Sequence, residues 1–271
     1  MSYLRTAIKR WLAWFALAVV FAIACWFLSQ WQLARRAEVV KVIQRIDSNY
    51  DRNPVAIDAL LPNPARFALK NEYRPVEIRG SYLARGQLLV RNRPQNGTNG
   101  FEQLCAFRLT TGEIVFVDRG WLPTGSKQDS PDVIPQPPTG TVTVQGRLRH
   151  SEGTDGRQAP AGQIAFANVP EALVRVGEPS TGNYSAVYLL LSSEDPNAST
   201  PALASKPDIG EGNHLSYAFQ WLLFALMGFG ALAWAIRQEY LHRKAAHDPT
   251  FVIPRRKRMG DSDSEFEDGA S

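Results

Sequence analysis

Two long stretches without a charged residue constrain most strongly what this chain can fold into. Residues 11–34 contain the run WLAWFALAVVFAIACWFL followed by SQWQLA, and residues 215–236 read LSYAFQWLLFALMGFGALAWAI. At about 1.5 Å per residue, a helix over either stretch would cross a hydrocarbon core of about 30 Å. We therefore expect transmembrane helices at residues 11–34 and 214–236.

A cleaved signal peptide is the alternative interpretation of the first stretch, because AIAC at residues 22–25 resembles a weak lipoprotein cleavage site. The apolar run continues past the cysteine through Trp26, Phe27 and Leu28, which makes it longer than the core of a usual signal peptide. We therefore expect the first helix to be retained as a membrane span.

The distribution of positive charge predicts the orientation of both helices. The chain has 30 Lys and Arg and 26 Asp and Glu, a formal net charge of +4, and the surplus lies at residues 1–10 and after residue 236. Because basic residues favour the cytoplasmic side, we expect residues 1–10 and 237–271 in the cytoplasm and residues 35–213 outside. Charge at membrane flanks indicates contact with the lipid bilayer, and we expect no nucleic acid partner.

The end of the chain is expected to be a disordered tail that is first basic and then acidic. Residues 255–258 are RRKR, and residues 261–268 are acidic with almost no apolar side chain. Such a segment cannot bury enough apolar surface to fold. The basic run is interpreted as solvated, with contact to lipid headgroups as the alternative.

The region between the two spans changes from a helical to a strand period. Residues 35–46 keep a helical spacing that extends the first helix, and prolines at 54, 62 and 64 end it. Alternating apolar residues and turn signals at Gly86, at 111–112 and at 138–140 then indicate strands. We predict strands at residues 73–83, 87–92, 102–109, 114–121, 141–148 and 186–191, and a short helix at 170–176.

These elements predict a membrane-anchored α+β protein. Its two transmembrane helices flank an extracytoplasmic domain, residues 35–213, that is expected to be a mainly antiparallel β barrel or sandwich. Residues 197–212 contain Pro and Gly and are expected to link this domain to the second helix.

The sequence lacks the motifs of the common enzyme and metal-transfer classes. It has no GxGxxG, Walker loop, GxSxG or HExxH, and its two cysteines, Cys25 and Cys105, do not form a CxxC. With only three methionines, it also lacks the soft ligands of a copper chaperone. We expect no enzymatic activity, and an envelope enzyme is the weakest of the alternatives.

Six short blocks together resemble the surfeit-locus protein one family. They lie in order between and around the two spans, and they are WQLAR (31–35), YRPVEIRGSYL (73–83), LLVRNRP (88–94), VFVDRGWLP (115–123), VQGRLR (144–149) and HLSYAFQW (214–221). The segment between Arg149 and Tyr184 carries no such block, and the charged tail is extra.

The resemblance implies an assembly factor, a kind of chaperone, for the haem-copper cytochrome c oxidase of the respiratory chain. It further implies help with inserting haem a into the catalytic subunit or stabilising that subunit, with this subunit and other oxidase assembly factors as partners. Only ten residues precede the first span, too few for a mitochondrial presequence, so a bacterial plasma membrane is expected. The alternative is a general two-pass envelope scaffold or sensor without haem contact.

His214 is the candidate ligand for haem iron, because it begins the last of these blocks and neutral imidazole is a normal axial ligand. His214, Tyr217 and Trp221 share one helical face and are the candidate contacts for transiently bound haem a. The alternative interpretation is an interfacial histidine and an aromatic stripe that packs against the first span.

Three arginines suggest a second hypothesis. Arg91, Arg93 and Arg119 could bind the propionates of a haem, although solvated strand residues or local ion pairs are the alternative. Gly80, Gly120 and Trp121 are interpreted as structural.

Overall fold

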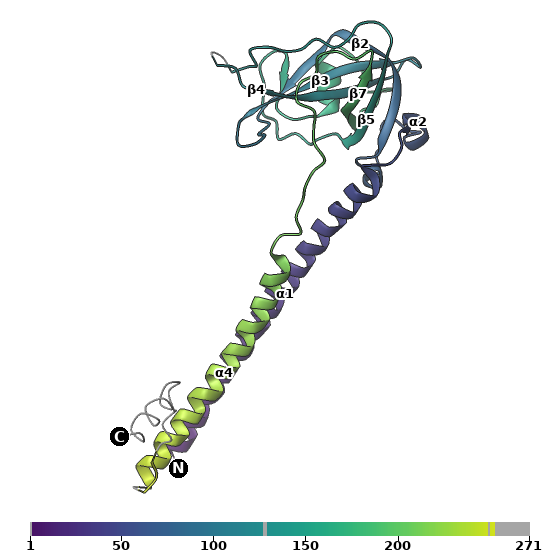
Figure 1. Cartoon of the computed structure of the whole chain (residues 1–271). Coiled ribbons are helices and arrows are strands. Elements are labelled where there is room, and N and C mark those ends of the chain that lie inside the picture. The colour runs from purple at the N-terminus through teal and green to yellow at the C-terminus, as the bar shows by residue number, and fades with distance from the viewer. Residues whose placement is uncertain (1, 127–128, 249, 253–271) are drawn as a thin grey trace, which may run out of the picture. The chain divides into compact units, whose positions relative to one another are not determined.

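A computed structural model describes residues 2–126, 129–248 and 250–252 of the chain (Figure 1). The basic run and the acidic segment expected in the tail lie outside these residues. The chain divides into two compact units. One comprises the described parts of Met1–Glu38 and Glu211–Ser271, and the other is Val39–Gly210.

The first unit consists of two long apolar helices that lie side by side (Figure 1). They are the first 37 described residues of α1 (Ser2–Asn49) and all of α4 (His214–His247). Their most apolar windows have mean hydropathies of 2.3 and 1.7, with 11% and 0% of the residues buried. A core helix of a soluble protein would be mostly buried, so these helices anchor the chain in a membrane. As predicted, α1 continues through residues 35–46.

The two helices meet along a seam with coiled-coil spacing. The less exposed positions include residues 18, 22, 25, 29, 32 and 36 on α1 and residues 214, 218, 221, 225 and 228 on α4. Steps of four and three residues keep one face of each helix turned toward its neighbour. Small side chains occupy much of this seam, and Cys25, Ser29 and Ala218 are at most 2% exposed. Close packing of small residues is what holds helices together in lipid.

The described residues of the second unit contain seven strands. They are β1 (Val55–Ala56), β2 (Pro75–Val90), β3 (Gly100–Leu109), β4 (Ile114–Pro123), β5 (Val142–His150), β6 (Gln163–Ile164) and β7 (Val187–Asp195). Three short helices accompany them, namely α2 (Ile57–Leu60), η1 (Leu69–Asn71) and α3 (Val169–Arg175).

Five of the strands close into a barrel. Their order is β2-β3-β4-β7-β5, and β5 pairs with β2 again through Val142–Arg147 and Pro75–Gly80. These pairings are antiparallel except between β4 and β7, and the short β1 and β6 add to β2 in parallel. Closure leaves no long unpaired edge. The predicted α+β class is thus confirmed, with a mainly antiparallel barrel.

The predicted turn at Gly86 is wrong. Strand β2 runs unbroken from Pro75 to Val90, and its register against β3 shifts between Tyr82 and Gln87. A Cβ on Gly86 would lie 2.7 Å from the Cβ of Ala106 on β3. The glycine therefore permits a close pass between strands at an irregularity rather than a reversal of the chain.

Both faces of the barrel wall are buried around β3 and β4. Val115 and Val117 belong to a cluster supplied by all five barrel strands, which is the barrel interior. Ile114 and Phe116 point the other way, into a cluster that includes Leu173 of α3. Burial on both faces explains why β4 begins with four consecutive apolar residues, 114–117, whereas β5 alternates as predicted.

Candidate functional site

The predicted iron ligand, His214, is the first residue of α4 and is half-buried in the helix seam. Its Nδ1 lies 2.9 Å from Oε1 of Gln32 on α1. Close by in the sequence, Arg36 forms an ion pair of 2.6 Å with Glu211. Together these contacts join α1 to the start of α4 through polar groups.

The structure brings two of the three predicted haem contacts to the seam. Trp221 lies there, two turns after His214, and packs edge to face against Phe224 with ring centroids 5.7 Å apart. Tyr217 is 49% exposed and lies at the edge of this face. Ala218, 2% exposed, fills the position between the histidine and the tryptophan. The aromatic stripe thus includes a packing surface for the first helix.

The hydrogen bond to Gln32 gives the imidazole a defined tautomer. An amide oxygen is an acceptor, so Nδ1 carries the proton and donates it. The lone pair is then on Nε2, which is the form of histidine that coordinates a metal, and such an orienting partner is usual for metal-binding histidines. The donor set therefore fits a haem iron. Sequence reasoning missed Gln32, although it lies inside the quoted block WQLAR.

The three arginines are engaged in local ion pairs, so the alternative to propionate binding is favoured. Arg119 is fully buried, and its Nη2 lies 2.6 Å from Oε1 of Glu194. Arg93 pairs with Glu102 and Glu152 at 2.9 and 2.6 Å. Arg91 pairs with Asp129 and donates to Gln163. The sequence did not indicate that Arg119 is buried. Its side chain is 0% exposed and therefore has no accessible surface for a ligand.

A segment that we call the strap, residues 197–210, leaves β7 and borders several cavities of the barrel unit. Its residue Ala202 exchanges two backbone hydrogen bonds with Trp121 of β4, at 2.8 and 3.1 Å. Further along, Lys206 forms an ion pair of 2.9 Å with Asp51. The strap is thus fixed to the barrel unit at two points.

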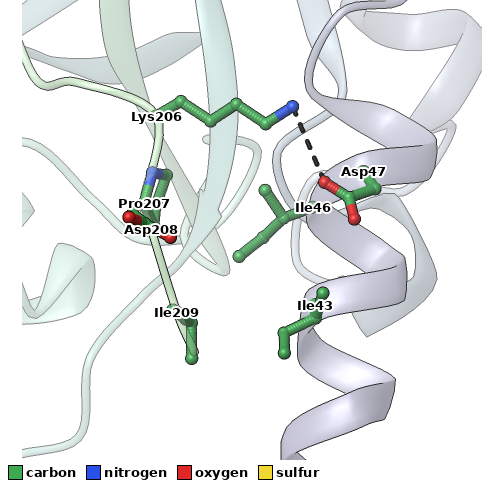
Figure 2. A pocket seen from close by; sticks show the side chains of 7 residues that line it. All are labelled: Ile43, Ile46, Asp47, Lys206, Pro207, Asp208 and Ile209. Carbon is green, nitrogen blue, oxygen red and sulfur yellow. Dashed lines mark ion pairs between the residues drawn. The ribbon is translucent and has the colours of Figure 1, made fainter. Parts of the chain in front are cut away.

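One cavity, of about 320 Å³, lies between the strap and the end of α1 (Figure 2). Ile43, Ile46 and Ile209 form its apolar wall, and Lys206 points across it toward Asp47, 3.7 Å away. The hydrogen bond with Asp51 raises the pKa of Lys206, so the amine stays protonated. A protonated amine is neither a nucleophile nor a base, and this cavity is a packing feature rather than a reaction site.

Comparison with known proteins agrees with the fold and the motifs. The family model described as the SURF1 family matches residues 19–226, which include the whole barrel and part of each apolar helix. SURF1-like proteins of Mycobacterium bovis and Mycobacterium tuberculosis are each 32% identical over 251 residues, covering 88% of this chain and 89% of theirs. The chain therefore belongs to the SURF1 family, a family of membrane-anchored oxidase assembly factors.

Proposed function

We propose that this protein assists the insertion of haem a into the catalytic subunit of a haem-copper cytochrome c oxidase, or the stabilisation of that subunit. The observation that carries the proposal is the oriented His214, whose Nδ1 is held 2.9 Å from Gln32. Membership of an oxidase assembly family supplies the context. The contact is transient, since an assembly factor must release what it passes on.

The polar and aromatic residues at the start of α4 and their partners on α1 have distinct parts in this proposal. Haem a, when bound, would supply an iron that accepts a nitrogen ligand and a large apolar ring. His214 would hold the iron through Nε2, and Gln32 would hold the tautomer that leaves this nitrogen free. Trp221 would offer an apolar wall, and the ion pair between Arg36 and Glu211 joins α1 to the residues just before α4.

Replacing the histidine tests this role against a matched control. His214→Ala should lower the a-type absorption band in reduced membranes, whereas His242→Ala, an exposed histidine on the same helix, should leave it unchanged. Gln32→Leu should have an intermediate effect, because the imidazole remains but its tautomer is no longer fixed. An unchanged a-type band in all three variants, with normal protein levels, would favour a scaffold or sensor without haem contact.

The partners and topology form a second part of the proposal. We place both termini in the cytoplasm and the barrel outside a bacterial plasma membrane, because basic residues flank the cytoplasmic ends of spans. The oxidase catalytic subunit and other assembly factors are then the partners. A Gln158→Cys variant tests the side, because this residue is exposed while Cys25 and Cys105 are buried. A membrane-impermeant maleimide should label it in intact cells, and labelling only after lysis would refute the orientation.

A further inference from the structure

A second cavity of the barrel unit, of about 340 Å³, has an acidic and aromatic lining. Arg93 and Pro94 border it after the end of β2, and Glu102 of β3 and Asp118 of β4 lie in its wall. Trp121 and the strap residues Ala202, Ala204 and Ser205 complete it. All of its lining residues belong to the unit Val39–Gly210.

Asp118 is the unusual group in this cavity. Its residue surface is only 4% exposed, although it lines the cavity. Among the described residues, the backbone N–H of Gly120, 2.9 Å from Oδ1, is the one hydrogen-bond donor of this carboxylate. Oδ2 is thus without a protein partner. Burial, and next the negative charge of Glu102, raise the pKa of Asp118 well above its usual value.

The charges around Asp118 are not balanced by the protein. Arg93 lies between two other carboxylates, those of Glu102 at 2.9 Å and Glu152 at 2.6 Å. Arg149 pairs with Glu72 at 3.2 Å, and its charge also acts on Glu102 and Glu152. Among the described residues no ion pair includes Asp118, and a buried carboxylate without a cation is costly.

The aromatic wall of the cavity is rigidly held. The indole Nε1 of Trp121 donates to the backbone oxygen of Arg93 at 2.7 Å. The backbone N–H and C=O of Trp121 both form hydrogen bonds with the backbone of Ala202. Gly120 has a φ of +130°, and a Cβ there would lie 2.6 Å from the oxygen of Ala202. The glycine lets the strap lie close to β4, so the cavity is preformed.

We propose that this cavity receives a basic side chain, arginine or lysine, from a partner protein. In their ionised forms Asp118 and Glu102 provide the negative charge, and Trp121 offers an aromatic side chain of the kind that binds ammonium and guanidinium groups. A metal ion is a poorer occupant. Within the described part of the chain, no group of three His, Cys, Asp or Glu side chains is placed to hold one, and an indole is not a metal ligand.

Calorimetric titration of the full-length protein in detergent tests the proposal. The probe is N-acetyl-arginine amide, with N-acetyl-citrulline amide as its uncharged match. The arginine probe should bind and the citrulline probe should not. Asp118→Asn should weaken binding by about tenfold, because a hydrogen bond to a charged partner is lost. Asp155→Asn, which removes an exposed carboxylate paired only with its neighbour Arg157, should not weaken it.

The pH dependence provides a second readout. The titratable groups that interact with Asp118 are Glu102 and Cys105 of β3, Glu152, Arg93 and Tyr188 of β7. A cation binds the ionised carboxylate, so the affinity for the arginine probe should rise as the pH is raised, and Asp118→Asn should reduce this rise. The asparagine keeps the oxygen that accepts from Gly120, so the fold should persist, as a melting curve would show.

Three results would overturn the proposal. Equal binding of both probes would mean that charge is not recognised, and unchanged binding in Asp118→Asn would place the probe elsewhere. Complete competition by millimolar magnesium or potassium chloride at constant ionic strength would assign the cavity to small cations instead. If Asp118→Asn fails to fold, Glu102→Gln answers the same question, since that carboxylate lines the same cavity and its side chain is 28% exposed.

Discussion

Replacing Arg119 by methionine should destabilise the barrel far more than a surface substitution does. The side chains of Arg119 and Glu194 are 0% and 1% exposed, and the guanidinium also donates to Gln103, Pro135 and Ser199 at 3.1–3.3 Å. Methionine fills a similar volume but leaves the carboxylate of Glu194 buried without its cation. Tyr82, whose hydroxyl donates to the same carboxylate at 2.9 Å, cannot supply that charge.

The size of the effect follows from the burial. Removing one partner of a fully buried pair costs about 3–5 kcal/mol. For a domain of this size class each kcal/mol lowers the melting temperature by about 2–4 °C, so the loss should be about 6–20 °C. Since domains are stable by about 5–15 kcal/mol, the variant should keep only part of its stability.

A double-mutant cycle identifies the cause of the loss. Circular dichroism melts of the detergent-purified protein would be recorded for Arg119→Met, Glu194→Gln and the double variant. Because the two residues interact directly, the double variant should lose clearly less than the sum of the single losses. Strictly additive losses would refute the argument from the ion pair. A drop in haem a content at an unchanged melting temperature would instead revive the propionate hypothesis.

Three further outcomes are expected. Gly80→Ala should lower the unfolding free energy by about 1–3 kcal/mol or more in denaturant titrations, because its Cβ would lie 1.9 Å from the backbone oxygen of Arg108, whereas Gly153→Ala, with open space around it, should have little effect. The effect of Asp118→Asn on the free energy of unfolding should be more favourable at pH 8 than at pH 5. The carboxyl of Asp118 loses its proton at a lower pH in the unfolded chain than in the folded protein, because its pKa is raised on folding. The native aspartate therefore costs stability as the pH rises through that interval. Lys206→Met should leave the melting temperature nearly unchanged in circular dichroism melts, since its ion pairs with Asp47 and Asp51 are exposed to solvent.

Local sequence patterns were sufficient to predict the two long helices and most of the strands. The apolar runs at residues 11–34 and 215–236 have a length that only a membrane span requires, and β5 alternates cleanly between Val and polar residues. The turn predicted at Gly86 was wrong because glycine is common both at turns and at close passes inside strands, so the residue type alone does not distinguish the two. The difference lies in Ala106 on the neighbouring strand, which the local sequence cannot show.

Contacts between distant residues account for what the sequence could not reveal. Arg119 and Glu194 are 75 positions apart, and neither neighbourhood indicates that the other will neutralise it. The parallel pairing of β4 with β7 and the closure of β5 onto β2 likewise depend on the whole barrel. His214 could be proposed as a candidate from the sequence because it is a chemically distinctive residue in a recognisable block. Its partner Gln32, 182 positions away, required the structure.

The packing of the seam determines how a loss of function at His214 should be interpreted. Small residues such as Ala218 and Ser29 bring α1 and α4 together, and the hydrogen bond between Gln32 and His214 adds only about 0.6–2 kcal/mol by analogy with other interhelical bonds in membranes. Alanine at position 214 is itself a small residue and a good helix former. His214→Ala should therefore leave the helix pair assembled, so a loss of haem a in that variant would report on the imidazole rather than on the anchor.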